Sequence, residues 1–231
     1  MTRKTVLITG ASDGLGRALA VLLSEHYDLA LCGRKPEKMA ETLALLKPGA
    51  DVYQECFDMT DEAALAAFCD HVKAHFSRID VLVNNAGANL ARGAVKDFDV
   101  SGLRKMLELN CISQVEMIQQ IYPAMKMQGG GCIINVISSS VLFHSENNAA
   151  YAASKAAMDA VAKTLLKEAK ADNIRVTCVY PGGIDTSFRA VPKHEYLRPE
   201  TVAGAIRSAI EVEDGAMQEI VIRPLVENNI Q

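Results

Sequence analysis

The sequence predicts an α/β fold in which helices cover both faces of one parallel β-sheet. Segments with the apolar composition of short buried strands alternate with helical patterns from one end of the chain to the other. Seven such strands joined by helices are typical of a doubly wound parallel sheet. The length of 231 residues and the apolar content of 49% suit one domain, residues 1–231, with a substantial core.

The first half of the chain contains four of the predicted strands. The apolar run 5–9 leads into a glycine-bearing turn, and the amphipathic pattern behind this turn predicts a helix that continues to about Glu25. The further strands expected here are 28–32, 51–57 and 79–85, with helices near 36–47 and 61–76 between them.

The second half continues the alternation without repeats, low-complexity stretches or linkers. The expected elements are a helix near 101–127, a strand at 130–138, a helix near 149–171, a strand at 173–181, a helix near 199–212 and a strand at 219–223. The helices near 101–127 and 149–171 are so rich in apolar residues that we expect them to be buried on more than one side. Burial against a second subunit predicts a homo-oligomer, a dimer or tetramer; burial within one subunit is the alternative.

Charge and hydropathy argue against nucleic acid and membranes as partners. The net charge is −4 and the pI is near 5.8, without a basic face. No apolar run approaches the roughly 20 residues of a membrane span, and the first residues enter a strand without a signal-peptide profile. We therefore expect a cytoplasmic protein.

The cysteine and histidine patterns predict neither disulfides nor a metal site. The six cysteines are scattered without CxxC spacing, as expected for reduced, buried side chains. His71 and His75 stand four residues apart on a predicted helix, but no third ligand is evident nearby.

The turn after the first strand has the composition of a phosphate-binding loop. Gly10, Gly14 and Gly16 precede or open the first helix, where side chains would block a phosphate. The amino terminus of a helix presents unpaired N–H groups and the positive end of its dipole, so a pyrophosphate can bind there. The order GxxxGxG differs from the common GxGxxG, and a simple tight turn is the alternative.

A tyrosine and a lysine four residues apart form a candidate acid/base pair. Tyr151 and Lys155 lie in a segment with strong helix-forming composition, so both side chains share one helix face. A phenol has a pKa of roughly 10, and a neighbouring ammonium favours the phenolate. The pair can therefore donate and accept a proton. Without other motifs, a packed ring and a solvated amine are the more common meaning of such a pair.

Six motifs in one order carry a resemblance to a known family. They are TGASDGLG at 9–16, NNAG at 84–87, Asn110, Ser138, YAASK at 151–155 and PGGIDT at 181–186. In these motifs the chain resembles the classical short-chain dehydrogenases/reductases, from the first strand to at least Thr186. The resemblance implies a Rossmann-type dinucleotide-binding domain.

The resemblance also implies a catalytic tetrad of Asn110, Ser138, Tyr151 and Lys155. Ser138 would donate a hydrogen bond to the substrate oxygen while Tyr151 delivers the proton. Lys155 would lower the pKa of the tyrosine and hold the nicotinamide ribose, and Asn110 would support the lysine through a water. A shift of one residue in the loop would transfer the role of Ser138 to Ser139.

The same resemblance implies which residues bind the cofactor. The glycine turn would hold the phosphates and the adenosine ribose, Asp58 the adenine amino group, and the PGGIDT segment the nicotinamide, with the Ile184 backbone meeting the carboxamide. NNAG would pass beside the adenosine ribose, although Asn and Gly also favour a purely structural turn. The cofactor residues expected on this basis are Gly10, Ser12, Asp13, Gly14, Leu15, Gly16, Arg34, Asp58, Met59, Asn84, Ala86, Gly87, Tyr151, Lys155, Pro181, Gly182, Ile184 and Thr186.

The end of the second strand favours NADP(H) over NAD(H). NAD-preferring relatives usually carry an acidic residue there, but this chain has Gly33 followed by Arg34. A guanidinium holds a 2′-phosphate by its charge and fork geometry. Asp13 is a contrary sign, because many NADP-preferring relatives carry a basic residue in the glycine turn. Use of NAD(H) as well is therefore kept open.

The expected activity is an NADP(H)-dependent carbonyl reductase or alcohol dehydrogenase that acts on a small molecule. An epimerase or dehydratase on the same fold and a non-catalytic cofactor-sensing regulator are the alternatives. The substrate face would include 142–144, the segment 89–92 and a short lid at about 187–198. His144 and His194 are candidates for substrate contact, although each is also typical of a surface histidine.

Overall fold

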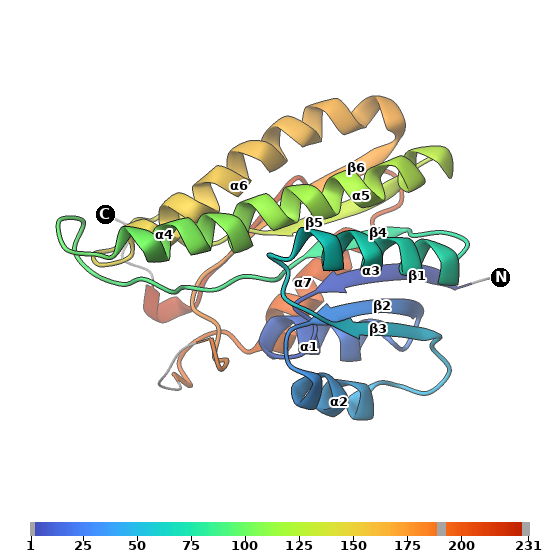
Figure 1. Cartoon of the computed structure of the whole chain (residues 1–231), viewed down its shortest axis with the longest axis horizontal. Helices are drawn as coiled ribbons and strands as arrows, with labels where there is room; N and C mark the ends of the chain where they lie inside the picture. Colours follow the sequence, from blue (N-terminus) through green and yellow to red (C-terminus); the bar gives the residue numbers. More distant parts are fainter. Residues whose placement is uncertain (1–2, 189–192, 228–231) are drawn as a thin grey trace.

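The computed structural model describes residues 3–188 and 193–227 and confirms the predicted α/β fold. All seven strands form one parallel sheet in the order β3-β2-β1-β4-β5-β6-β7 (Figure 1). The strands are β1 (Lys4–Thr9), β2 (Tyr27–Gly33), β3 (Val52–Cys56), β4 (Val81–Asn84), β5 (Gly131–Val136), β6 (Ile174–Pro181) and β7 (Glu219–Ile222).

The helices begin and end within a few residues of the positions expected from the sequence. The α-helices are α1 (Gly14–Leu23), α2 (Pro36–Leu45), α3 (Glu62–His75), α4 (Val100–Leu107), α5 (Ser113–Met127), α6 (Ala149–Glu168) and α7 (Pro199–Glu211). Short turns of 3-10 helix are η2 (Ser139–Val141), η3 (Ala169–Asp172) and η4 (Leu225–Glu227), and η1 (Glu108–Ile112) is a π-helical turn.

Helices cover both faces of the sheet, as Figure 1 shows. α1, α2 and α7 lie on one face, and α3, α5 and α6 lie on the other. Each face has its own apolar core: Leu19 and Ile206 belong to the first, and Phe68 and Met158 to the second. Because both faces are covered, the inner strands such as β1 and β4 are nearly continuous buried runs, whereas exposed and half-buried residues alternate in the edge strand β7. Among the described residues, no helix combines the length and apolar character needed to cross a membrane.

Local sequence signals fix where several helices start. The Asp13 carboxylate accepts a hydrogen bond of 2.8 Å from the Gly14 N–H at the start of α1. Asp61 caps α3 in the same way by accepting from the Ala64 N–H. α2 and α7 instead begin with a proline, which lacks the N–H that a first helical turn leaves unpaired.

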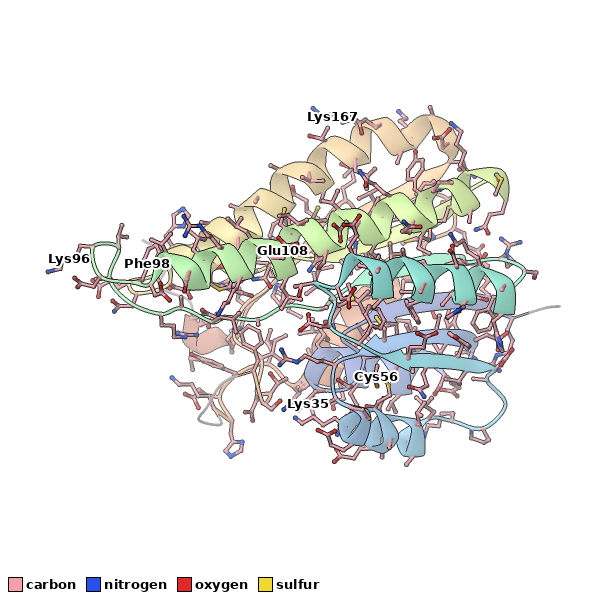
Figure 2. All side chains as sticks on the ribbon, in the orientation of Figure 1. Lys35, Cys56, Lys96, Phe98, Glu108 and Lys167 are labelled. Carbon is pink, nitrogen blue, oxygen red and sulfur yellow. The ribbon has the colours of Figure 1, made fainter. Side chains whose placement is uncertain are left out.

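The structure differs from the sequence prediction between α4 and α5. One helix was expected near 101–127, but the π-helical turn η1 interrupts it at Glu108–Ile112, at the junction where Figure 2 labels Glu108. Asn110 lies inside this turn and is fully buried. Its Oδ1 accepts from the Ala88 N–H and its Nδ2 donates to Ala88 O, each at 2.9 Å. These bonds stabilise the wider turn, which is a feature common at functional sites.

The sheet has one topological switch point, between β1 and β4. From β1 the chain runs outward through β2 and β3, whereas β4 lies on the other side of β1 and continues to β7. The connections that follow β1 and β4 therefore leave the carboxyl edge in opposite directions and open a crevice between them. Several predicted site residues follow these two strands.

Candidate active site

A cleft of about 910 Å³ opens at the carboxyl edge of the sheet. Segments that follow all seven strands line it, so residues far apart in the sequence meet there. It contains all the residues predicted to be catalytic or to bind the cofactor except Asn84 and Asn110. The residues predicted from separate motifs thus meet on one continuous surface.

The glycine turn is packed so closely that positions 10 and 16 have no room for a side chain. A Cβ on Gly16 would lie 2.1 Å from Gly10 O, and a Cβ on Gly10 would lie 2.9 Å from Ala86 Cα. Gly10 also has a φ of +68°, in the left-handed region that favours glycine. The Asn85 side chain ties the turn to β4 by donating to Thr9 O at 2.9 Å. The amino terminus of α1 is therefore exposed to the cleft at a fixed position.

The negative charge of Asp13 is balanced by an ion pair with Lys38. Its carboxylate accepts hydrogen bonds from Lys38 Nζ, Ser187 Oγ and the Gly14 N–H. Partial burial raises the pKa of this carboxyl, but the three hydrogen bonds outweigh burial and hold the pKa below its ordinary value of 3.8. Asp13, the residue that argued against NADP(H) in the sequence, is thus paired with Lys38 of α2.

Three cations stand at the end of β2. Arg34, Lys35 and Lys38 line the cleft beside Gly33, and Figure 2 labels Lys35 near the start of α2. Arg34 and Lys35 are exposed, and neither has an ion pair within the described part of the chain. These cations would attract a negatively charged group of a ligand to the end of β2.

Asp58 lies at the next strand end and is held as a carboxylate. Its Oδ1 accepts from the Thr60 N–H at 3.0 Å and from the Thr60 hydroxyl at 2.8 Å. These hydrogen bonds lower the pKa of Asp58, and the charge of Arg34 contributes further. The remaining lone pairs of an ionised carboxylate can accept from a ligand amino group.

The side chain of Asn84, a residue predicted to bind the cofactor, does not line the cleft. Asn84 is fully buried within the sheet and donates to Asn135 Oδ1 at 3.1 Å, across the β4–β5 register. Its neighbour Asn85 lines the cleft instead, together with Ala86 and Gly87. Side chains alternate along a strand, so one position separates an internal residue from a cleft residue.

Lys155 is the buried cation of the site. Only 3% of it is exposed, and its Nζ donates to Val136 O at 2.8 Å. Burial lowers the pKa of its ammonium from 10.5 to about 8, and the nearby Cys111 thiol acts weakly in the opposite direction. The pKa of Lys155 is therefore low enough for the side chain to gain or lose its proton at mildly alkaline pH.

Tyr151 stands one helical turn before Lys155, and both side chains line the cleft. The tyrosine is half-buried, and its ring lies 6.0 Å from the ring of Phe188 in an edge-on arrangement. Phe188 and Ser187 belong to the predicted lid at 187–198, so one end of this segment extends over the tyrosine. Residues 189–192 of the lid lie outside the described part of the chain.

The loop after β5 supplies three serines to the cleft. Ser138 Oγ accepts from the Ser140 N–H at 3.1 Å and from the Ser140 hydroxyl at 3.0 Å, which fixes its position at the start of η2. Ser139 also lines the cleft, so location alone does not decide between Ser138 and Ser139. Both are almost completely buried in the free protein.

Asn110 lies behind the cleft rather than on its surface. Besides its bonds to Ala88, its Nδ2 donates to Ser154 Oγ at 2.9 Å and so links η1 to α6. A Cβ on Gly87 would lie 3.0 Å from Asn110 Oδ1 and 3.3 Å from Lys155 Nζ. Position 87 therefore packs closely against both polar groups.

Other predictions for the substrate side hold only in part. Phe143, His144 and Leu90 line the cleft, but Leu142 does not. His194 is exposed and pairs with Asp185 at 3.0 Å, away from the cleft. His71 and His75, which were considered only as metal ligands, contact different carboxylates, Glu55 and Asp51.

Several cleft residues are not among the site residues predicted from the sequence, some within the predicted motifs and some far from them. These are Gly33, Lys35, Lys38, Phe57, Asn85, Leu109, Arg223, Val226 and Glu227, among others. The run of basic residues after the second strand was a usable signal for the two lysines. No local pattern marks the residues near the carboxyl end, because they reach the cleft only through the path of the chain after β7.

Comparison with known proteins agrees with the motifs. The family model described as short chain dehydrogenase matches residues 4–196. An uncharacterised oxidoreductase of Staphylococcus epidermidis is 30% identical over 227 residues, which cover 96% of this chain and 97% of the relative. A further oxidoreductase, from Mycobacterium bovis, is 31% identical over 90% of this chain and 64% of its own length.

Solved structures of other proteins have a similar overall fold. An alcohol dehydrogenase from the archaeon Thermococcus sibiricus, complexed with 5-hydroxy-NADP, has a TM-score of 0.89 and 25% identity, with 97% of each chain covered. A metagenomic short-chain oxidoreductase in complex with NADP has a TM-score of 0.84 and 26% identity, with 96% of each chain covered. The family match, the motif order and the cleft together establish that this chain belongs to the short-chain dehydrogenase family of oxidoreductases.

Proposed function

We propose that this protein is an NADP(H)-dependent oxidoreductase that interconverts a carbonyl compound and a secondary alcohol, with Tyr151 as the acid and base. The observation that carries this proposal is the junction of two features in one cleft. A half-buried tyrosine and a buried lysine lie at one end, and a glycine turn with a cluster of cations lies at the other. A dinucleotide is long enough to connect the two.

The chain's own groups divide the work at the reacting carbon. The bound nicotinamide would supply the hydride to a carbonyl or accept it from an alcohol. Tyr151 would donate a proton to the developing alkoxide, and Ser138 would donate a hydrogen bond to the same oxygen. The Lys155 ammonium favours the tyrosine's phenolate by its charge, so the phenol becomes a stronger acid.

The fit of NADP(H) rests on charge at the adenosine end. Arg34 and Lys35 are available for a 2′-phosphate, and the position where a carboxylate would bind a ribose hydroxyl is Gly33. Asp13, which would disfavour a phosphate, is bound by Lys38. The similar structures complexed with 5-hydroxy-NADP and with NADP support the same choice. Asp58 would accept from the adenine amino group.

A homo-oligomer and a cytoplasmic location are further parts of the proposal. On α6, the small apolar residues Ala153, Ala156, Ala160 and Val161 are exposed in the single chain, although the sequence led us to expect burial on more than one side. A second copy would cover them. All six cysteines are free thiols, as expected in a reducing compartment.

The decisive variant is Tyr151→Phe, which removes one hydroxyl and keeps the ring. We expect it to bind NADPH as the wild type does and to lose at least about 100-fold in kcat with an aldehyde or ketone substrate, since general acid catalysis contributes that much or more. Tyr122→Phe is the matched control, because Tyr122 lies outside the cleft and donates to Asp172 at 2.7 Å. Substantial remaining activity of Tyr151→Phe would rule out this tyrosine as the acid.

A further inference from the structure

The last described residues of the chain form one wall of the cleft. Arg223, Val226 and Glu227 follow β7 and line the cleft, although they lie beyond residues 4–196 that match the family model. The backbone brings them there: the Gly182 N–H donates to Ile222 O at 2.8 Å, which holds the end of β7 against the turn after β6. The carboxyl-terminal segment is therefore placed beside the predicted nicotinamide site.

Glu227 binds this turn directly. Its two carboxylate oxygens accept from the Gly183 N–H at 3.0 and 3.1 Å. The contact needs a glycine at position 182, because a Cβ there would lie only 2.3 Å from Glu227 Oε2. Gly183 immediately precedes Ile184, so the carboxylate fixes the backbone that would meet the nicotinamide carboxamide.

Arg223 holds Glu227 in place and reaches the other side of the cleft. Its Nη2 donates to Glu227 O at 2.5 Å, and its Nε lies 3.8 Å from Glu227 Oε2. The guanidinium also stacks over the ring of Phe143, 4.1 Å from the ring centre. Its side chain is only 16% exposed, so the charge is partly desolvated and its contacts are stronger than at an open surface.

Phe143 belongs to the loop that carries the predicted hydrogen-bond donor Ser138. The Phe143 N–H donates to Ser139 O at 2.8 Å, so the ring is attached to the η2 turn itself. The contacts thus form a chain from the Ser138 loop through Phe143 and Arg223 to Glu227 and Gly183. These two walls must keep a fixed separation for a substrate oxygen and a nicotinamide carbon to react.

We propose that Arg223 and Glu227 are positioning residues that set the distance between the Ser138 loop and the Pro181–Ile184 turn. This inference rests on the proposed function, because it assigns the nicotinamide to that turn. Both residues act through others: Glu227 through the Gly183 N–H, and Arg223 through Glu227 and Phe143. They shape the nicotinamide and substrate half of the cleft and leave the adenosine half unchanged.

The test compares variants at Glu227 by two ligands. Adenosine 2′,5′-bisphosphate occupies only the adenosine half, whereas NADPH occupies both. We expect Glu227→Ala to weaken NADPH and to lower kcat, each by about tenfold, because one hydrogen bond to a charged acceptor is lost. Binding of adenosine 2′,5′-bisphosphate should stay within about twofold of the wild type. Glu227→Gln should recover most of both losses, because its amide oxygen still accepts from the Gly183 N–H.

Variants at Arg223 separate charge from stacking. Arg223→Lys keeps the charge but lacks the planar fork, so we expect a fall in kcat of about threefold to tenfold with little change in the bisphosphate affinity. Glu213→Gln is a control for the loss of one surface carboxylate, since Glu213 is exposed and lies outside the cleft. Equal losses for NADPH and the bisphosphate in Glu227→Ala would overturn the inference.

Hydrogen exchange of the free protein keeps this test separate from the proposed function. The amide of Gly183 should exchange at least about tenfold faster in Glu227→Ala than in the wild type, and Glu227→Gln should restore protection. Unchanged exchange would show that Glu227 does not hold the Gly183 N–H. If exchange changes as expected but the wild type binds no NADPH, the proposed function fails and the positioning role fails with it, while the contact itself stands.

Discussion

Replacing Lys155 by methionine should make the protein inactive without making it less stable at neutral pH. The substitution shortens the unbranched side chain by one atom and removes the charge of a residue that is 3% exposed. Turnover should be lost because Tyr151 no longer has the ammonium that favours its phenolate. Stability should not fall with it, because the folded protein no longer holds a desolvated charge.

The magnitude follows from the pKa of this lysine. Burial lowers it from 10.5 to about 8, and one pKa unit corresponds to about 1.4 kcal/mol, so the charged form costs roughly 3 kcal/mol in the folded state. Methionine relieves this cost but leaves Val136 O without its donor, a loss of about 1–3 kcal/mol. At pH 7 the variant should therefore be as stable as the wild type or more stable, by up to about 2 kcal/mol.

The sign of the pH dependence makes this prediction specific. Below about pH 8 Lys155 is charged in both folded and unfolded chains. Between about pH 8 and 10.5 the unfolded chain binds one more proton than the folded one, so the wild type gains roughly 3 kcal/mol of stability as pH rises through this window. Methionine binds no proton, so Lys155→Met lacks this gain. Titrating groups remote from Lys155 are the same in both proteins and cancel in the difference, whereas Cys111, which interacts with the charge of Lys155, does not cancel fully.

Urea unfolding at several pH values from 7 to 10.5 measures this difference. The free energy of unfolding of the wild type, minus that of Lys155→Met, should rise by roughly 3 kcal/mol across the series. Lys167→Met is the matched control, because Lys167 lies exposed on the same helix and points into solvent in Figure 2. A difference that stays flat from pH 7 to 10.5 would refute the argument that burial perturbs Lys155.

Three further predictions concern the cofactor and the proton. In carbonyl reduction at low NADPH, kcat/KM should fall as pH rises above about 8, where Lys155 loses its charge in the free enzyme; a plateau to pH 10 would contradict its lowered pKa. Arg34→Ala should weaken NADPH by about tenfold or more and NADH little, measured by fluorescence titration; equal losses would mean that another group binds the 2′-phosphate. Lys38→Met should weaken NADPH binding by about threefold to tenfold at low salt, because Asp13 loses its ion pair. Adding Asp13→Asn should restore part of the affinity. No restoration would show that Lys38 does not act through Asp13.

The fold could be predicted because each of its signals is local. Strands buried on both faces are continuous apolar runs, and helices such as α1 and α3 start at capping aspartates, Asp13 and Asp61. The π-helical turn at Glu108–Ile112 could not be predicted, because the hydrogen bonds that stabilise it join Asn110 to Ala88, 22 residues away. No property of the turn's own sequence distinguishes it from an α-helix.

The site divides in the same way between local and distant causes. Tyr151 and Lys155 share a helix face, so their meeting follows from their spacing alone. The neutralisation of Asp13 by Lys38 depends on a packing of α2 against the glycine turn that sequence patterns do not specify. The contact of Glu227 with Gly183 joins two segments 44 residues apart and is equally invisible in the sequence. Asn84 shows that a correct motif can still place a single side chain on the wrong side of a strand.

The most direct test of the central claim is a titration of the wild type and Tyr151→Phe with NADPH, followed by NADPH oxidation with a panel of aldehydes and ketones. The account predicts that both proteins bind NADPH more tightly than NADH and that only the wild type turns over. Comparable turnover by the two proteins would contradict the role of Tyr151. Absence of NADPH binding by the wild type would contradict the assignment of the cleft as a dinucleotide site.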